Sequence, residues 1–269
     1  MTEGTTSDVA DLAALAERDY LTYARSFGRV PGVSIVDDGE LLARRGEPAH
    51  DYLSLVLGTW ARDESVDAVI DRAIEQVGGA GRPFTWSVWP SNQPAGLRDR
   101  LLVRGFSFLG DGPLMTIDLA TADLPAATPA GLEIERVTDG AVLREAGKAA
   151  MAPGAGDSAA TDIFHGAYER LVLGDAPEMR YFAGRVNGRI VATSALYTGT
   201  GLAGIYAVGT APEERGRGYG RALTAAALLE GRRLGYDTGA LLSSEMGIPV
   251  YRRLGFETVG TVGFYASPA

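Results

Sequence analysis

The stretch at residues 208–221 concentrates glycines and arginines at spacings that suit phosphate chemistry. Its charged and glycine positions near the centre are Arg215, Gly216, Arg217, Gly218, Gly220 and Arg221. Glycines let backbone N–H groups approach an oxyanion closely, and the first turn of a following helix adds about half a positive charge. Guanidinium groups form paired hydrogen bonds with phosphate oxygens. The stretch therefore predicts a site for a phosphate-bearing ligand.

Local charge and missing residues narrow the type of ligand. Residues 215–253 hold seven arginines against three acidic residues, although the whole chain has a formal net charge of −9. A P-loop nucleotide site needs a lysine after its glycines, and none follows these. The dinucleotide fingerprint Gly-x-Gly-x-x-Gly also differs from the spacing of Gly216, Gly218 and Gly220. A glycine-rich turn with solvated arginines is the alternative without a ligand.

Hydrophobic periodicity indicates the elements that position this stretch. Residues 181–186 and 190–196 predict two strands joined by a tight Asn-Gly turn, and a third strand ends at Val208. The apolar residues of 218–234 recur on one side of a helix. Further elements are predicted at residues 133–137 (strand), 141–150 and 161–173 (helices), and 238–243 (strand). This order is typical of an α/β fold in which antiparallel strands precede a parallel crossover.

Landmarks of the second half of the chain recur in the first half. An Asx-Gly turn, a strand ending in Gly-Thr and a Gly-Phe corner each occur twice in the same order, at offsets of 149, 151 and 150 positions. The glycines concerned are Gly39 and Gly188, Gly58 and Gly209, and Gly105 and Gly255. This recurrence predicts a duplicated fold, with chance as the alternative in a chain that has 36 glycines.

Residues 120–131 lack any hydrophobic period and contain two prolines, so they are expected to link two domains, at residues 1–125 and 126–269. The 269 residues, 46% of them hydrophobic, suit two globular domains. No apolar run is long enough to cross a bilayer and the N-terminus lacks the features of a signal peptide, which predicts a cytoplasmic protein without a membrane partner.

Composition also excludes some chemistry. The chain has no cysteine, and its two histidines have no partner at a ligand spacing, so neither a thiolate nucleophile nor a metal site is expected. The net charge of −9 argues against a nucleic-acid partner, since such binding relies on a basic surface. A small-molecule partner is therefore expected, with the protein a monomer or a homodimer.

The combined pattern resembles the GNAT superfamily of acetyl-CoA-dependent N-acetyltransferases. Arg215-x-x-Gly218-x-Gly220 follows a strand, and Tyr251-Arg-Arg-Leu-Gly255-Phe256 comes about thirty residues later. The resemblance covers roughly residues 131–269. The landmarks of the first half look like a second, degenerate copy. The implied fold class is α/β, with two tandem GNAT-like domains, each a twisted mixed β-sheet flanked by helices.

The resemblance implies acetyl-CoA as co-substrate, with no metal. The strand ending near Val208 is expected to splay from the 238–243 strand, so that the pantetheine arm of the cofactor enters between them. The implied cofactor-binding residues are Val208, Gly209, Thr210, Arg215, Gly216, Arg217, Gly218, Tyr219, Gly220, Arg221 and Ser244. Ser244 departs from the asparagine that many members carry, which puts that contact in doubt.

The reaction that the resemblance implies is direct attack of a neutral amine on the acetyl thioester. A backbone N–H near Val208 is the candidate donor to the oxyanion, and Tyr251 the candidate acid for the departing thiolate. A packing role is the alternative for Tyr251. The base stays open between Glu245, Tyr206, His165 and a chain of waters, because residues 202–207 carry no carboxylate.

The first half lacks the residues of the loop. Aligning Gly58 on Gly209 places residues 65–69 on 216–220, which removes every glycine and adds an acid, and Leu101 takes the tyrosine position. This copy is expected to bind no pyrophosphate there and to scaffold or wall the acceptor cleft.

The leading function is therefore N-acetylation of a primary amine on a small molecule such as an amino acid, peptide, amine metabolite or antibiotic. A non-catalytic acetyl-CoA-binding regulatory module and a protein-modifying acetyltransferase are the alternatives. The acidic surface favours basic substrates in the latter case, through electrostatic steering.

Overall fold

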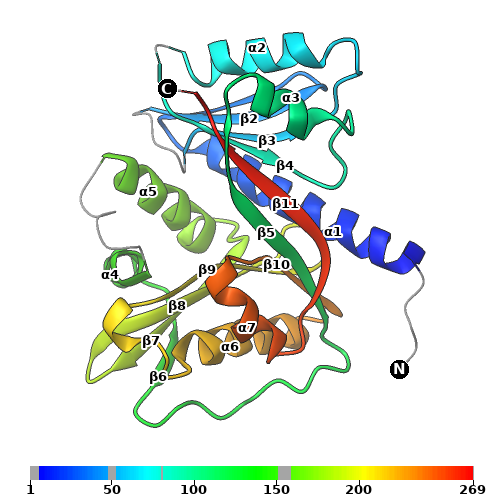
Figure 1. Ribbon diagram of the computed structural model, residues 1–269. Coiled ribbons are helices and arrows are strands. Elements are labelled where there is room, and N and C mark those ends of the chain that lie inside the picture. The colour runs from blue at the N-terminus through cyan, green and yellow to red at the C-terminus, as the bar shows by residue number, and fades with distance from the viewer. Residues whose placement is uncertain (1–5, 48–52, 80, 151–158, 269) are drawn as a thin grey trace. The chain divides into compact units, whose positions relative to one another are not determined.

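A computed structural model describes residues 6–47, 53–79, 81–150 and 159–268 (Figure 1). The chain divides into two compact units: unit 1 contains Met1–Leu114 and Val259–Ala269, and unit 2 contains Met115–Thr258. The expected boundary after residue 125 differs from this division, which falls between Leu114 and Met115 and also returns the end of the chain to unit 1. Each unit has a mixed sheet with flanking helices, and the expected α/β fold class is confirmed.

Unit 1 begins with a long helix, continues with three antiparallel strands, and then adds a parallel strand after a helical crossover. Its elements are α1 (Thr6–Ser26), β1 (Val33–Asp37), β2 (Leu41–Gly46), β3 (Leu55–Thr59), α2 (Val66–Gln76), β4 (Thr85–Val88), α3 (Leu97–Val103) and the first part of β5 (Ser107–Asp118). β1, β2 and β3 pair antiparallel in that order, and β3 pairs parallel with β4.

The last strand of the chain completes the sheet of unit 1. β11 (Glu257–Ala266) pairs antiparallel with β4, with Tyr265 opposite Trp86. Both side chains are buried in the apolar core of this unit. Ser267 continues the pairing, since its backbone N–H donates to the carbonyl of Phe84 at 2.9 Å. The C-terminal residues thus belong structurally to the first unit, whatever their place in the sequence.

Unit 2 follows the same plan with longer strands. Its elements are β6 (Glu133–Arg136), α4 (Gly140–Ala150), α5 (Ala159–Leu173), β7 (Met179–Val186), β8 (Arg189–Tyr197), β9 (Ala203–Thr210), α6 (Tyr219–Arg233), β10 (Thr238–Leu242) and α7 (Ile248–Arg252), with short 3-10 turns at Pro212–Glu214 and Glu245–Gly247. β6 to β9 are antiparallel neighbours, and β10 pairs parallel with β9.

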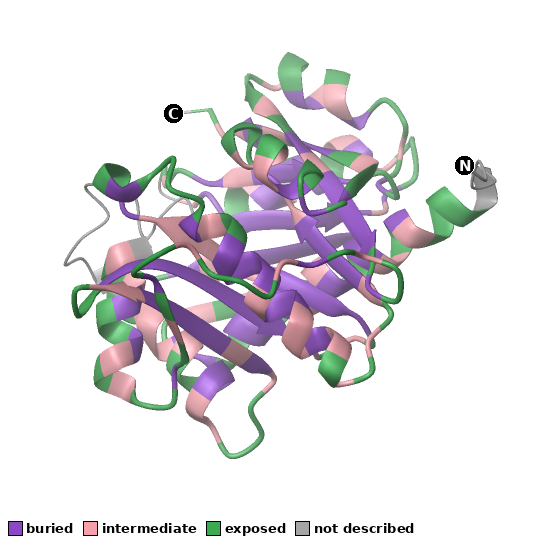
Figure 2. Cartoon of the chain, turned by 90° about the horizontal axis from the view of Figure 1, so that it is seen from below, coloured by how far each residue is buried: buried purple, intermediate pink, exposed green. Residues whose placement is uncertain are grey.

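Helices cover both faces of the sheet in unit 2. Neighbouring residues of a strand point to opposite faces. Tyr181 of β7 contacts Tyr168 of α5, at 5.7 Å between ring centroids, whereas Phe182 lies in the apolar cluster that contains the buried side of α6. α5 and α6 therefore lie on opposite faces of β7 (Figure 1). In Figure 2 the strands are mainly purple, and many outer helix surfaces are green.

Each unit ends its second crossover with the same cap. In unit 1 the N–H of Phe106 donates to the carbonyl of Leu101, and in unit 2 the N–H of Phe256 donates to the carbonyl of Tyr251. Both bonds span five positions, as in a Schellman cap with glycine in the left-handed region. The Gly-Phe landmarks of the sequence therefore mark one local structure that occurs in both units.

The segment expected to link two domains lies within unit 2 instead. Residues 120–131 connect β5 to β6 and form no helix or strand. The segment is anchored rather than free, because Leu124 and the adjacent Leu132 are buried in the core cluster of unit 2 and Arg232 donates to the carbonyl of Ala122. Small and polar residues suggested a linker, whereas two leucines hold the segment on the core.

Candidate active site in unit 2

β9 carries a bulge close to its end. Thr193 of β8 pairs with Gly209 and Ala195 pairs with Tyr206, so that one residue of β8 faces two of β9, Ala207 and Val208. Ala207 has a φ of +49°, which is unusual for a residue with a Cβ atom. The bulge removes Val208 from the regular ladder and leaves its backbone available for other partners.

β9 and β10 separate immediately after they meet. Their parallel pairing is limited to Ala203 with Gly239 and Gly204 with Ala240, although β9 continues to Thr210 and β10 to Leu242. The two strands therefore diverge at their carboxyl ends, where ligands commonly bind in α/β sheets. This is the splay that the resemblance implied, and the bulged part of β9 forms one side of it.

The glycine-rich stretch forms a turn that leads directly into α6. Gly218 is the N-cap of α6 with a φ of +82°, in the left-handed region, and no side chain caps the helix. The first hydrogen bond of the helix is donated by the N–H of Ala222 to the carbonyl of Gly218. The N–H groups of Tyr219, Gly220 and Arg221 consequently have no acceptor within the helix.

The start of α6 lies close to the end of β9. A Cβ atom placed on Gly220 would lie 3.2 Å from Oγ1 of Thr210, closer than most real contacts. The absence of a side chain at this position lets the helix N-terminus approach the strand. Three free N–H groups and the positive end of the helix dipole thus stand next to the splayed strand end, an arrangement that suits an anion.

The three arginines of the loop differ in their partners. Nε of Arg215 donates to the carbonyl of Thr210 at 3.3 Å, and Nη1 of Arg217 lies 3.4 Å from Oε2 of Glu214. Arg221 is exposed and makes no ion pair with a described residue. The three arginines predicted to bind phosphate thus lie around one turn, and the guanidinium of Arg221 is available to a ligand.

An acidic brace that sequence reasoning missed holds this loop. The side chain of Glu214 is only 12% exposed and accepts a 2.6 Å hydrogen bond from Arg189, the first residue of β8. Arg189 also pairs with Glu213 at 2.8 Å. Arg189 therefore fixes the 3-10 turn before the glycines to the sheet. An arginine that follows a hairpin turn gives no sequence signal for such a role.

Tyr251 lies in α7 within the core cluster of unit 2 and is only 8% exposed. Its ring makes an edge contact with Phe256 at 5.8 Å between centroids, and it lies so close to Gly247 that a Cβ atom there would come within 2.6 Å of the ring. Its hydroxyl makes no hydrogen bond to a described residue. Burial raises the pKa of Tyr251 to about 12, so that the phenol is protonated at neutral pH.

The residues between β10 and α7 lie at the surface. Ser244 and Glu245 are both exposed, at the start of the 3-10 turn Glu245–Gly247, and the carbonyl of Ser244 accepts from the N–H of Gly247. Glu245 makes no ion pair or hydrogen bond with a described residue. The roles predicted for both residues therefore stay predictions.

The other two candidate bases belong to the face of the sheet that α5 covers. Tyr206 of β9 faces Ala195 and Ala195 faces Tyr181, so these side chains share one face. His165 lies in α5, where its ring contacts Gly147 of α4. Burial lowers the pKa of His165, with a smaller opposing effect from Asp162, and the imidazole is neutral at physiological pH.

A buried threonine that the sequence did not single out holds the bulge. Oγ1 of Thr193 donates to the carbonyl of Ala207 at 2.8 Å, and Thr193 is fully buried. Its hydroxyl also lies within hydrogen-bond reach of Tyr181. Since Ala207 has the unfavourable positive φ, this hydrogen bond stabilises the conformation that exposes the backbone of Val208.

The corresponding helix start in unit 1 is built differently. α2 begins at Val66, whose side chain is fully buried, and Asp67 follows with ion pairs to Arg100 and Arg104. Beyond the parallel pairing of β3 and β4, a further bridge joins Trp60 to Gln93. Unit 1 thus presents a carboxylate where unit 2 presents glycines and arginines.

Comparisons with known proteins agree with this geometry. Residues 154–256 match the model of the Acetyltransferase (GNAT) family. This stretch contains the bulged strand, the glycine loop, α6, β10 and α7. This stretch is therefore similar to the GNAT acetyltransferases. A comparison of the sequence with curated proteins gave no match.

Solved structures of GNAT proteins share the fold over nearly the whole chain. A GCN5-related N-acetyltransferase from Kribbella flavida is 19% identical, with a TM-score of 0.69, covering 94% of this chain and 95% of that one. A tandem GNAT protein from the clavulanic acid biosynthesis pathway is 19% identical, with a TM-score of 0.60, covering 97% and 94%. A GCN5-related N-acetyltransferase from Sphaerobacter thermophilus is 17% identical, with a TM-score of 0.61, covering 86% and 81%. At such identities the likeness shows the fold.

Two further observations concern the described residues as a whole. No group of three histidine, aspartate or glutamate side chains among them is arranged to hold a metal ion. No helix in the described part of the chain combines the length and the hydrophobicity of a transmembrane helix.

Proposed function

We propose that the chain is an acetyl-CoA-dependent N-acetyltransferase whose active site lies in unit 2. The observation that carries this proposal is the combination of a bulged, splayed β9 with the uncapped start of α6 beside it. The splay suits the extended pantetheine arm, and the helix start suits the pyrophosphate. The residues proposed to contact the cofactor are Val208, Gly209, Thr210, Arg215, Gly216, Arg217, Gly218, Tyr219, Gly220, Arg221 and Ser244.

The reaction is a direct transfer. The lone pair of a neutral amine attacks the thioester carbonyl, the C–S bond breaks as the C–N bond forms, and the amine loses a proton. The N–H of Val208, freed by the bulge, donates to the developing oxyanion. Tyr251 supplies the proton to the departing thiolate, and its raised pKa keeps that proton in place until the sulfur accepts it.

The acceptor is proposed to be a primary amine of a small molecule that approaches from the α5 face. Tyr206 and Tyr197 lie there in edge contact, at 6.0 Å between ring centroids, and Tyr197 donates to the carboxylate of Glu178 at 3.1 Å. Aromatic faces and a carboxylate attract an ammonium before it is deprotonated. Tyr206, His165 and Glu245 are the candidates for the base, and pH–rate profiles of single variants distinguish them.

The experiment that tests the function is a panel of amines incubated with acetyl-CoA and scored by released thiol. The panel holds amino acids, short peptides, polyamines, aminoglycosides and basic proteins. Turnover of a small amine is the expected result. We also propose that the enzyme is cytoplasmic. Acetylation confined to the proteins would establish a protein-modifying enzyme, and binding of acetyl-CoA without any turnover would establish a regulatory module.

Acetyl-CoA is expected to bind once per chain. The start of α6 in unit 2 carries glycines and arginines, whereas α2 of unit 1 opens with Val66 and Asp67, and the carboxylate of Asp67 would repel a pyrophosphate. Isothermal titration calorimetry of the full chain should give a stoichiometry near one. A value near two would contradict the proposal that unit 1 is a degenerate copy.

Thr193→Val is expected to lower kcat about tenfold with little change in KM for acetyl-CoA. The variant keeps the shape of the side chain but removes the hydrogen bond to Ala207, worth about 1 kcal/mol, that stabilises the bulge. A displaced Val208 N–H then loses part of its contact with the oxyanion. Steady-state kinetics measure the effect, and Thr193→Ser, which keeps the hydroxyl, should retain most of the activity. Equal losses in both variants would mean that Thr193 contributes only to packing.

A further inference from the structure

Unit 1 contains a pocket of about 340 Å³. None of the residues proposed above for cofactor binding or catalysis lines this pocket. One face of α1 forms one wall, because its lining residues recur at helical spacing. The loops that follow β3 and β4 form the other wall. The residues that matter are Glu17, Arg18, Leu21 and Arg25 from α1, Trp60 after β3, and Ser91 after β4.

Glu17 is a buried carboxylate without a cation. It is 4% exposed, and it accepts hydrogen bonds from the hydroxyl and, at 3.4 Å, from the backbone N–H of Ser91. Among the described residues no arginine or lysine pairs with it. Burial raises the pKa of Glu17 against the effect of these hydrogen bonds. A buried charge with neutral donors only is costly, and a cation arriving in the pocket would offset that cost.

Trp60 offers a second group suited to a cation. Its indole Nε1 donates to Oγ of Ser91 at 3.2 Å, and the same hydroxyl donates to Glu17. This chain of hydrogen bonds fixes the position of the Trp60 indole relative to the Glu17 carboxylate at the pocket. An ammonium within about 6 Å of an indole face is attracted by the ring quadrupole. Trp60 and Glu17 can therefore contact one ammonium group together.

The pocket also has one available guanidinium. Arg25 is engaged, since it pairs with Asp37 at 2.7 Å. Arg18, in contrast, forms no ion pair with a described residue. One unpaired carboxylate and one unpaired guanidinium thus line the same cavity, which complements a ligand that carries one charge of each sign. A volume of about 340 Å³ lies at the small end of ligand pockets.

We propose that this pocket binds a small zwitterionic amino compound of about the size of an amino acid. Its ammonium group lies against Glu17 and Trp60, and its carboxylate pairs with Arg18. The position supports the proposal, because Trp60 and Ser91 follow the carboxyl ends of the parallel strands β3 and β4, where ligands bind in α/β sheets. The site is separate from the acetyl-transfer site and does not depend on it.

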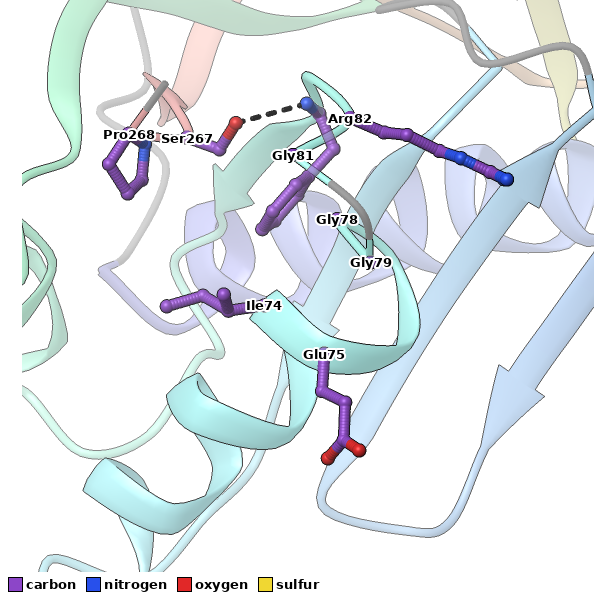
Figure 3. A pocket seen from close by; sticks show the side chains of 9 residues that line it. Ile74, Glu75, Gly78, Gly79, Gly81, Arg82, Ser267 and Pro268 are labelled. Atoms are coloured by element: carbon purple, nitrogen blue, oxygen red, sulfur yellow. Dashed lines mark hydrogen bonds between the residues drawn. The ribbon is translucent and has the colours of Figure 1, made fainter.

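A second pocket of unit 1 lacks these features. It measures about 360 Å³ and lies between the end of α2 and the C-terminal residues Ser267 and Pro268 (Figure 3). Its guanidinium, that of Arg82, is already paired with Glu47. In Figure 3 the side chains of Glu75 and Arg82 extend away from the apolar lining. This pocket therefore offers no unpaired buried charge to a ligand.

Tryptophan fluorescence of the full chain tests the proposal. Trp86 and Trp89 are buried, whereas Trp60 is partly exposed and lines the pocket, so a ligand there changes the signal of Trp60. The probes are the protein amino acids other than tryptophan and tyrosine, each at up to about 10 mM, a range that detects millimolar dissociation constants. Tryptophan and tyrosine fluoresce themselves and are tested by calorimetry instead. At least one amino acid is expected to give a saturable change. Two half-ligands test the need for both charges: an amine that lacks the carboxylate of that amino acid, and a carboxylic acid that lacks its ammonium group. Each should bind at least tenfold more weakly.

Variants distinguish this pocket from the acetyl-transfer site of unit 2. Glu17→Gln keeps the shape of the buried side chain, and Arg18→Gln changes an exposed one, so both are expected to fold and to lose at least tenfold in affinity. Arg62→Gln, an exposed arginine of unit 1 outside the pocket, is the matched control and should bind normally. Calorimetry confirms each affinity. If Glu17→Gln does not fold, Arg18→Gln decides.

The proposal is overturned by any of three results. The first is that no amino acid gives a saturable response. The second is that Arg18→Gln or a folded Glu17→Gln binds as well as the unchanged chain. The third is that the half-ligands bind as tightly as the whole one. Since none of these measurements uses acetyl-CoA, failure here leaves the proposed acetyltransferase activity untouched, and failure of that activity leaves this pocket untouched.

Discussion

Gly218→Val abolishes acetyl-CoA binding while the chain stays folded: this is the expected result of changing the N-cap of α6. Gly218 has a φ of +82°, where a β-branched residue is strained by about 1–3 kcal/mol. Relief of that strain rotates the N–H groups of the first helical turn away from the bound pyrophosphate. The added methyl groups also occupy the space that the phosphate oxygens need. Calorimetric titration with acetyl-CoA measures the loss.

Gly235→Val is the matched control for backbone strain. Gly235 lies just past the other end of α6, has a φ of +91°, and has no atom within 4 Å of the place that a Cβ atom would take. The same substitution there introduces the same kind of strain far along the helix from the loop. Thermal unfolding of the two variants should shift by similar amounts, whereas only Gly218→Val should lose the cofactor. Normal binding by Gly218→Val would exclude the loop as the pyrophosphate site.

Tyr251→Phe lowers kcat by about 10²-fold or more and leaves the affinity for acetyl-CoA unchanged. This is the usual scale for the loss of a positioned general acid. The ring contact with Phe256 survives in the variant, and the lost hydroxyl has no hydrogen-bond partner among the described residues, so the stability of the fold should not fall. Steady-state kinetics with a thiol reagent measure kcat, and calorimetry measures the affinity.

Tyr236→Phe serves as the control for a lost tyrosine hydroxyl. Tyr236 also belongs to unit 2, and its hydroxyl donates to the carbonyl of Thr198 at 3.3 Å, away from α7. This variant should retain kcat. If Tyr251→Phe turns over as fast as Tyr236→Phe does, Tyr251 is a packing residue and water protonates the thiolate.

The features that could be read from the sequence are those whose physical cause is local. The Asn187-Gly188 turn, the glycine N-cap of α6 and the Gly-Phe corners form where they were expected. Each depends on a backbone conformation that one or two neighbouring residue types permit. The candidate loop could be located from the sequence for the same reason.

The features that only the tertiary structure decided depend on partners far apart in the chain. Hydrophobic alternation predicts that a segment is a strand, but it does not select the neighbouring strand. Hence β11 could be expected as a strand, while its pairing with β4 of unit 1 could not. In the same way, the composition of residues 120–131 indicated a linker. It could not show that Leu124 is buried, because that burial depends on core residues far away in the sequence.

The bulge and the unit 1 pocket show the same limit at single residues. Alanine rarely has a positive φ, and Ala207 adopts one because the hydroxyl of Thr193, from the neighbouring strand, holds its carbonyl. Glu17 and Ser91 are 74 positions apart and meet only when α1 packs beside the end of β4. The sequence by itself determined the loop chemistry and the local turns, since short-range sterics act before folding is complete. The chain's long-range packing determined which strands pair and which polar groups are buried together.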